Sequence, residues 1–188
     1  FNSQDYDVIL TTASLSLRLA MIAPRLKAAT IGWQHNCYDG YLHVKPVVFW
    51  QQENLLQQYL PNLDRYIVLS DYDKRDYMEK LGIDCEVKIN PRSFVSEKKC
   101  DVKSKRFLMA TRFVYAKGLD LMMESFEEFC KEDSEWELDI IGDGDLFDQI
   151  RADAKKRHLE KRVHFVGYTN EPEKYYLNSS VFLLPSRW

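Results

Sequence analysis

Two cations lie close together where a predicted strand gives way to a predicted helix. Arg112 and Lys117 follow the apolar run 106–110 and precede an amphipathic pattern that begins at Leu119. The N-terminus of a helix attracts anions through its free N–H groups and its dipole. Arg binds phosphate with a planar fork, and Lys adds a point charge. The spacing predicts a diphosphate site, with two solvated surface cations as the alternative interpretation.

Glycines mark the same kind of turn throughout the second half of the chain. Four of the seven follow predicted strands there: Gly118, Gly142, Gly144 and Gly167. Glycine lets the backbone approach a ligand closely or adopt positive φ, whereas a tight turn alone would also select it. The run Gly142-Asp143-Gly144 is not a dinucleotide fingerprint because residue 147 is Phe, and no Gly-Lys-Ser/Thr follows it to make a P-loop.

A histidine occupies the corresponding position in the first half. His35 lies just past the predicted strand 29–33, where it is suited to bind or polarise a hydroxyl or a phosphate. A structural histidine that hydrogen-bonds to its loop is the alternative. His43 has a weaker case. His158 lies in a basic segment that reads as an exposed helix end, and His164 lies within a strand, where packing explains it.

Composition and cysteine spacing exclude several classes of function. Of 188 residues, 45% are hydrophobic and 29% charged, which is typical of a globular protein. A net charge of −3 argues against a nucleic-acid partner. The four cysteines form no CxxC pair and none adjoins a histidine at ligand spacing, so zinc and disulfide frameworks are disfavoured. Scattered thiols fit a reducing compartment.

The elements that position these residues alternate between strand and helix. Strands are predicted at 7–11, 29–33, 65–69, 85–89, 106–110, 137–141, 163–166 and 181–184. Predicted helices cover 15–26, a segment that Pro46 opens, and a segment that Ser70 or Asp71 caps and Gly82 ends. Asn170 with Glu173 resembles a capping box before a further helix.

This alternation predicts an α/β fold with parallel sheets covered on both faces. Ligands of such sheets bind beyond the carboxyl ends of the strands, where the residues named above lie. Residues 92–105 are polar and lack an apolar period, so we interpret them as a linker. Residues 1–91 then belong to one Rossmann-like domain and 106–188 to a second, and both domains are present only in part.

One segment of the first half combines cations with apolar residues. Residues 17–28 hold Arg18, Arg25 and Lys27 among Leu, Met and Ile side chains. Such a segment can touch an anionic membrane surface, although an ordinary helix with one buried face is the more frequent cause of this pattern. No apolar run reaches the roughly 20 residues of a membrane span.

Four motifs in order resemble the nucleotide-sugar-binding domain of the large retaining glycosyltransferase family of GT-B fold, which includes lipopolysaccharide, capsule and sucrose-related transferases. They are Ala-Thr-Arg-Phe-Val-Tyr-Ala-Lys-Gly at 110–118, Trp-Glu-Leu-Asp-Ile-Ile-Gly-Asp-Gly at 136–144, Val-His-Phe-Val-Gly-Tyr at 163–168 and Val-Phe-Leu-Leu-Pro-Ser at 181–186. The first half is similar to the same family more loosely, through Trp-Gln-His-Asn at 33–36, Tyr-Ile-Val-Leu-Ser at 66–70 and Ile-Asn-Pro at 89–91.

The resemblance implies transfer of a sugar from a nucleotide diphosphate donor with retention. Arg112 and Lys117 would neutralise the leaving diphosphate. His35 would lie near the donor sugar and the acceptor. The nucleotide would be bordered by Gly142, Asp143, Gly144, Gly167 and Tyr168. The acceptor is expected to be a glycan or a lipid-linked molecule of surface polysaccharide synthesis, with no metal or other cofactor and no nucleic-acid partner.

The same resemblance predicts features that the sequence lacks. A pair of glutamates is expected directly after Trp188 and a glycine-rich loop before Phe1, so we expect the chain by itself to be inactive. A cytoplasmic location, with peripheral contact at the inner face of the membrane, is the expectation. Two alternatives stay open: a GT-B-like sugar-nucleotide epimerase, and a non-catalytic module that binds a nucleotide or a sugar.

Overall fold

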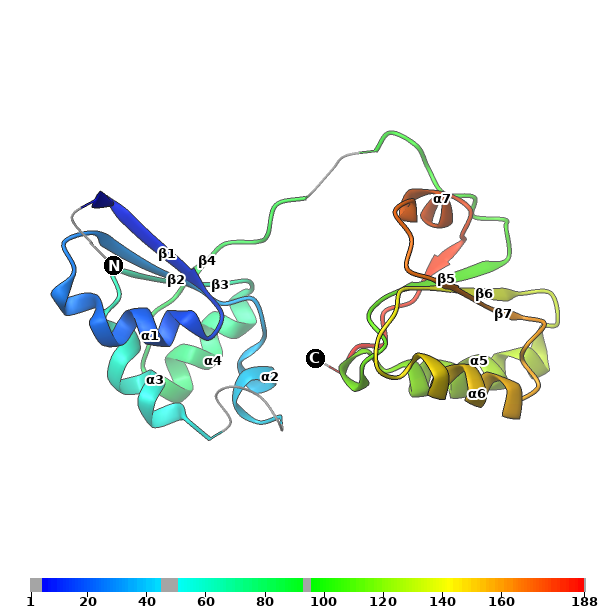
Figure 1. Ribbon diagram of the computed structural model, residues 1–188, viewed down its shortest axis with the longest axis horizontal. Helices are drawn as coiled ribbons and strands as arrows, with labels where there is room; N and C mark the ends of the chain where they lie inside the picture. Colours follow the sequence, from blue (N-terminus) through cyan, green and yellow to red (C-terminus); the bar gives the residue numbers. More distant parts are fainter. Residues whose placement is uncertain (1–4, 45–50, 93–95, 188) are drawn as a thin grey trace. The chain divides into compact units, whose positions relative to one another are not determined.

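The computed structural model describes residues 5–44, 51–92 and 96–187. The chain divides into two compact units, unit 1 (Phe1–Ser93) and unit 2 (Phe94–Trp188), each with its own sheet (Figure 1). None of the helices in the described residues is long and apolar enough to cross a bilayer.

Unit 1 is built on a four-stranded parallel sheet in the order β1-β2-β3-β4. Its strands are β1 (Val8–Thr12), β2 (Ala29–Trp33), β3 (Arg65–Val68) and β4 (Glu86–Val87). Its helices are α1 (Leu15–Ile22), η2 (Ala23–Arg25), α2 (Tyr38–Leu42), α3 (Glu53–Tyr59), η3 (Leu60–Asn62) and α4 (Asp71–Leu81). The predicted strand–helix alternation of this half is confirmed.

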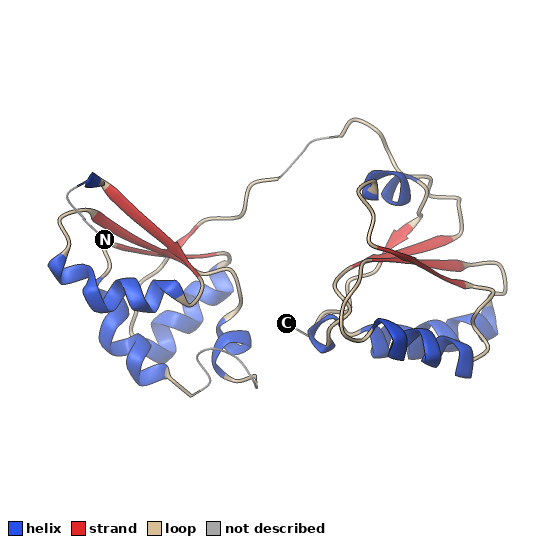
Figure 2. Cartoon of the chain, viewed as in Figure 1, coloured by secondary structure: helices blue, strands red, loops and turns tan. Residues whose placement is uncertain are grey.

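The helices of unit 1 lie on one face of its sheet (Figure 2). Each successive strand is added on the same side of the preceding one, and right-handed crossovers that advance in one direction place every helix on the same face. Val8 and Leu10 point to the other face of β1 and remain 52% and 50% exposed. The expectation of helices on both faces is therefore wrong for the described part of unit 1.

The helix-covered face carries the core of unit 1. Tyr77 of α4, Val68 of β3 and Leu42 of α2 are fully buried in one cluster with residues from α1 and η3. Tyr77 packs edge-on against Tyr38 and Tyr66, with ring centroids 5.2 and 5.4 Å apart. The core thus joins the short helix α2 to the rest of the layer.

Unit 2 contains a four-stranded parallel sheet in the order β7-β6-β5-β8. The strands are β5 (Arg106–Ala110), β6 (Glu137–Ile141), β7 (Val163–Gly167) and β8 (Val181–Phe182). The helices are η4 (Tyr115–Lys117), α5 (Leu119–Glu132), α6 (Phe147–Lys156) and α7 (Pro172–Leu177).

The direction of the sheet reverses once in unit 2. The chain advances from β5 to β7, then returns to place β8 on the free side of β5. With right-handed connections this return moves α7 to the face opposite α5 and α6, as Figure 1 shows. The reversal makes a topological switch point between β5 and β8, where ligands of parallel sheets bind.

Some of the predicted helix ends are confirmed and others are not. Ser70 accepts a hydrogen bond from the Asp73 N–H and caps α4, and Gly82 ends that helix at φ 69°, so both predicted roles are confirmed. Asn170 is not a cap, because α7 begins after Glu171. The helix start expected at Pro46 lies outside the described residues. Helix α2 has no counterpart among the helices predicted from the sequence.

The stretch predicted as a linker contacts unit 2 in its described part. The Asp101 N–H donates to the Leu177 carbonyl at 2.8 Å, and the hydroxyls of Ser104 and Ser180 are 2.9 Å apart. Lys98 pairs with Glu173 at 3.3 Å. Residues 96–105 are therefore attached to α7 and to the start of β8.

Candidate functional site

The backbone of three loops interlocks at the carboxyl end of the sheet in unit 2. The Phe113 N–H, in the loop after β5, donates to the Asp143 carbonyl after β6 at 2.8 Å. The Gly142 N–H donates to the Gly167 carbonyl at the end of β7, also at 2.8 Å. These bonds bring Gly142, Asp143, Gly144 and Gly167 to one edge, next to the loop that carries Arg112 and Lys117.

Two of these glycines serve different purposes. Gly142 has φ 129°, and a Cβ there would lie 1.8 Å from the Thr111 carbonyl oxygen, so close packing of two loops requires a glycine. Gly167 has φ 77°, and a Cβ there would meet nothing within 4 Å. Packing between two loops therefore accounts for Gly142, while Gly167 borders open space.

The two predicted cations are unpaired among the described residues. Arg112 is exposed and Lys117 is half-buried at the end of η4, and neither takes part in an ion pair within that part of the chain. Helix α5 begins directly after Gly118, which supplies no side-chain cap to its first turn. Unpaired positive charge beside a helix N-terminus favours binding of an anion.

Acidic and aromatic side chains complete this edge of unit 2. The Asp143 carboxylate accepts a hydrogen bond from the Gly144 N–H at 2.8 Å, which ties it to its own loop. Tyr168 is 79% exposed, so its ring is free to contact a ligand. Within the described residues, no three His, Cys, Asp or Glu side chains gather as a metal site.

His35 lies at the carboxyl end of β2 in unit 1, as predicted, and its side chain is exposed. Its ring stacks on that of Trp33, with centroids 5.1 Å apart. The His35 N–H donates to the side-chain oxygen of the buried Gln34, whose amide nitrogen donates to the Tyr77 hydroxyl at 3.3 Å. The loop is thus fixed to the core while the imidazole remains accessible.

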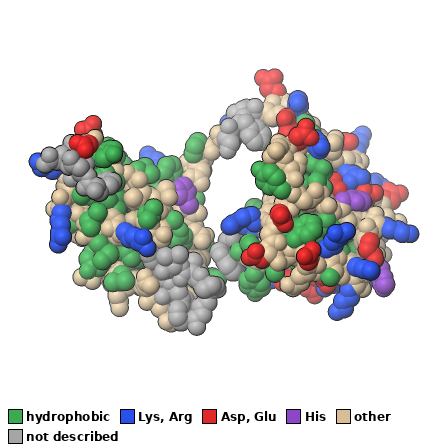
Figure 3. All heavy atoms as spheres, in the orientation of Figure 1, with side chains coloured by type: hydrophobic (Ala, Val, Ile, Leu, Met, Phe, Trp, Pro, Cys, Tyr) green, Lys and Arg blue, Asp and Glu red, His purple; other side chains and the backbone are tan. Residues whose placement is uncertain are grey.

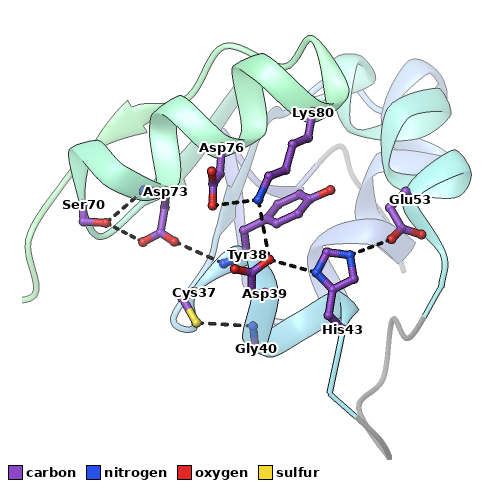
Figure 4. A network of polar contacts seen from close by, with 10 residues as sticks. All are labelled: Cys37, Tyr38, Asp39, Gly40, His43, Glu53, Ser70, Asp73, Asp76 and Lys80. Carbon is purple, nitrogen blue, oxygen red and sulfur yellow. Dashed lines mark hydrogen bonds and ion pairs between the residues drawn. The ribbon is translucent and has the colours of Figure 1, made fainter. Parts of the chain in front are cut away.

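Helix α2, which follows the His35 loop, is held against α4 by polar contacts (Figure 4). The Tyr38 N–H donates to Asp73 at 3.1 Å, and Lys80 lies 4.4 Å above the Tyr38 ring while it pairs with Asp39 and Asp76. His43 links Asp39, at 2.8 Å, to Glu53 of α3. These contacts orient the segment that carries His35.

The remaining histidines take structural positions. His164 of β7 contacts Glu137 of β6 at 2.8 Å, so it joins two strands, and a hydrogen bond as well as packing explains it. His158 follows α6 at φ 57°. His43 belongs to the network around α2, where it contacts Asp39 and Glu53 (Figure 4).

One functional candidate at this edge was not predicted from the sequence. Arg187, which follows β8, donates to Asp120 of α5 and to the Tyr115 carbonyl. Its sequence signal was its position just past a predicted strand end, the criterion that selected Arg112. Its partner could not be foreseen, because Asp120 lies 67 residues earlier in the chain.

A family model described as "Glycosyl transferases group 1" matches residues 93–188, and the chain belongs to this family. An uncharacterized glycosyltransferase of Haemophilus influenzae is 27% identical over 186 residues, which cover 96% of this chain and 50% of the relative. The chain thus spans about half the length of that curated relative.

Solved structures show the same fold. A lipopolysaccharide outer core galactosyltransferase, WaaB, superimposes with a TM-score of 0.71 at 23% identity, over 96% of this chain and 50% of that one. A variant of Staphylococcus aureus TarM, crystallised with UDP among its ligands, superimposes with a TM-score of 0.70 at 21% identity, over 85% and 32%. The two parallel sheets are therefore those of a GT-B-type, Rossmann-like α/β fold.

Proposed function

We propose that this protein transfers a sugar from a nucleoside diphosphate donor to a glycan or lipid-linked acceptor, with retention at the anomeric carbon. The observation that carries the proposal is the pair of cations, Arg112 and Lys117, which form no ion pair among the described residues and lie next to the switch point between β5 and β8. Membership in the group 1 glycosyl transferases and the likeness to a UDP-bound relative support a nucleotide sugar as the donor.

In this proposal the cations act on charge that develops during the reaction. As the bond between the anomeric carbon and the phosphate oxygen breaks, negative charge grows on the leaving diphosphate. Arg112 and Lys117 stabilise that charge together with the N-terminus of α5. Because the charge is greater in the transition state than in the bound donor, this interaction raises the rate as well as the affinity.

The other predicted residues take supporting roles. The loop Gly142-Asp143-Gly144 and the end of β7 at Gly167 and Tyr168 form the wall against the nucleotide. His35 of unit 1 belongs to the acceptor side, where its exposed imidazole contacts a hydroxyl of the acceptor. The proposed donor chemistry uses no metal, because fixed cations neutralise the diphosphate.

Calorimetric titration of the protein with UDP, GDP and ADP tests the donor site. We expect one of these nucleotides to bind, and Arg112→Ala with Lys117→Ala to weaken its binding at least about 100-fold, since a hydrogen bond to a charged group contributes about 1.5–3 kcal/mol. The control Arg151→Ala with Lys155→Ala removes equal charge from exposed positions on α6 and should leave the affinity unchanged.

Two outcomes would count against the proposal. Equal losses in the two double variants would assign the effect to net charge instead of to the site. In the full-length protein, binding of a nucleotide without release or transfer of sugar from the matching nucleotide sugar would favour the non-catalytic module.

We further propose that α1 of unit 1 contacts an anionic membrane surface, the location expected for a lipid-linked acceptor. The outward side of α1 carries Leu15, Met21 and Ile22, each about half exposed, together with the exposed Arg18. Arg25 and Lys27 follow the helix in exposed positions, and the sequence holds no acidic residue from 8 to 38. Apolar and basic groups on one helix face suit an interface with anionic lipid, such as the inner face of a membrane.

A further inference from the structure

Two segments far apart in the sequence, the residues after β8 and the turn before α5, are in contact at the edge of unit 2 where the cations lie. Arg187 emerges from β8, and its backbone N–H donates to the Ala116 carbonyl of η4 at 2.7 Å. Its guanidinium donates to both carboxylate oxygens of Asp120, at 2.9 and 2.7 Å, and to the Tyr115 carbonyl at 2.8 Å. It also stacks on the Tyr115 ring at 4.0 Å. We call these residues, 115, 116, 120 and 187, the Arg187 clamp.

The Arg187 clamp contacts residues on both sides of Lys117. Tyr115 and Ala116 belong to η4, whose last residue is Lys117, and Asp120 lies in the first turn of α5. Between them, the Gly118 position has no room for a Cβ, because one would lie 2.1 Å from the Pro185 carbonyl oxygen. The chain that leaves β8 therefore packs directly on this turn.

The side chain of Arg187 is mostly shielded from solvent in this contact. Only 19% of it is exposed, against 53% for the Asp120 carboxylate. A bidentate bond from a planar guanidinium fixes direction as well as distance, which a flexible surface ion pair does not. The hydrogen bonds from Arg187 also lower the pKa of the Asp120 carboxyl, so Asp120 is ionised at neutral pH and its charge is compensated by the clamp.

We infer that Arg187 is a positioning residue for the proposed diphosphate site. It holds the Tyr115–Lys117 turn against the segment after β8, so that Lys117 is fixed beside the switch point, and it neutralises a carboxylate that would otherwise repel an anion at the start of α5. This inference rests on the proposed function, because it names how the same site is held in place.

The test measures binding of the tightest nucleoside diphosphate among UDP, GDP and ADP, and of its parent nucleoside, to Arg187→Ala, Asp120→Ala and the double variant. We expect Arg187→Ala to weaken diphosphate binding at least about tenfold, since a small misplacement of a binding group is costly, and to leave nucleoside binding unchanged. The double variant should lose no more than Arg187→Ala alone, because either change opens the clamp.

A second pair of variants asks whether Arg187 acts through Lys117. In a Lys117→Ala background, Arg187→Ala should weaken diphosphate binding clearly less than it does in the wild type, because only the repulsion by the uncompensated Asp120 carboxylate then remains. Hydrogen exchange of residues 115–120 supplies a readout that needs no ligand, and it should accelerate in Arg187→Ala while β6 stays protected. Arg187→Lys, which keeps the charge but loses the fork, should lie between the wild type and Arg187→Ala.

The outcomes separate this inference from the proposed function. A wild-type protein that binds no nucleoside diphosphate overturns both. If the wild type binds a nucleoside diphosphate, either of two results for Arg187→Ala overturns the positioning role alone. These results are equally tight binding of that diphosphate and hydrogen exchange of residues 115–120 that is no faster than in the wild type. Equal weakening of diphosphate and nucleoside would also overturn it, because that pattern reports a general loss of structure in unit 2.

Discussion

At the scale of single residues, two glycines of the candidate site differ in whether a Cβ atom would fit there. Gly142 and Gly167 both adopt positive φ at the carboxyl end of the sheet in unit 2. A Cβ at Gly142 would overlap the Thr111 carbonyl, while one at Gly167 would enter open space. The same residue type therefore serves loop packing at one position and an open border of the site at the other.

This difference predicts unequal stability losses for two matched substitutions. Gly142→Ala should destabilise unit 2 by about 3 kcal/mol or more, because backbone strain and overlap with the neighbouring loop add up. Gly167→Ala should cost roughly 1–2 kcal/mol, the price of positive φ alone. Urea denaturation followed by hydrogen exchange of β5 and β6 measures both, and similar losses would contradict the packing explanation.

At the scale of elements, α4 organises unit 1. Its Tyr77 is fully buried, accepts a hydrogen bond from the Gln34 amide and lies 3.4 Å from the Tyr66 hydroxyl. Burial raises the pKa of Tyr77 to about 12 and raises that of Tyr66 as well. Through Tyr77, helix α4 contacts the loop of His35, and the buried Tyr77 hydroxyl stays protonated in the folded state.

These shifts predict that unit 1 loses stability at alkaline pH. An unfolded tyrosine ionises near pH 10, while Tyr77 in the folded state keeps its proton until about pH 12. Above pH 10 the unfolded state has released a proton that the folded state retains, so stability falls as pH rises. Tyr77 alone should account for a loss of about 1.4 kcal/mol by pH 11.

Urea midpoints of the two units at pH 8 and pH 11, resolved by hydrogen exchange, check this prediction. Tyr77→Phe should be about 1–2 kcal/mol less stable at pH 8, since two hydrogen-bond partners are lost, and should show a smaller alkaline decline. Unit 2 is an internal control, because none of its described tyrosines is buried. An undiminished alkaline decline in Tyr77→Phe would exclude this residue as its cause.

At the scale of the whole molecule, the faces of the two units that Figure 3 shows differ in how charge is distributed. In the view of Figure 3, acidic side chains on unit 1 lie at its margin, while acidic and basic side chains alternate over unit 2. The outward side of α1, with Arg18 and the exposed Met21, lies in the segment that holds no acidic residue. The lack of acidic residues around α1 therefore predicts that the protein binds anionic vesicles in preference to neutral ones.

The protein should sediment with vesicles of phosphatidylcholine and phosphatidylglycerol but not with vesicles of phosphatidylcholine alone. Arg18→Ala with Arg25→Ala should weaken that binding about 30-fold, since each cation near an anionic surface contributes about 1 kcal/mol. Arg151→Ala with Lys155→Ala on α6 is the charge-matched control and should bind as the wild type does. Equal loss in both variants, or binding to neutral vesicles, would contradict a role for α1.

Much of this architecture could be predicted from the sequence. Short apolar runs located the strands and helical spacing of apolar residues located most helices, because both signals are local in the sequence. The short helix α2 was missed, since its five residues are held by Asp73 and Lys80 of α4 and not by a periodic pattern of its own. The strands β4 and β8 are shorter than predicted, because only two residues of each pair with a neighbour.

The sequence by itself determined that Arg112, Lys117 and His35 follow strands of parallel sheets, because a residue's place after a strand is a local property of the chain. The tertiary structure decided the rest: that β8 returns beside β5, that unit 1 carries its helices on one face, and that Arg187 reaches Asp120. Those facts depend on strand order and on contacts between segments far apart in the chain, and local patterns do not encode either one.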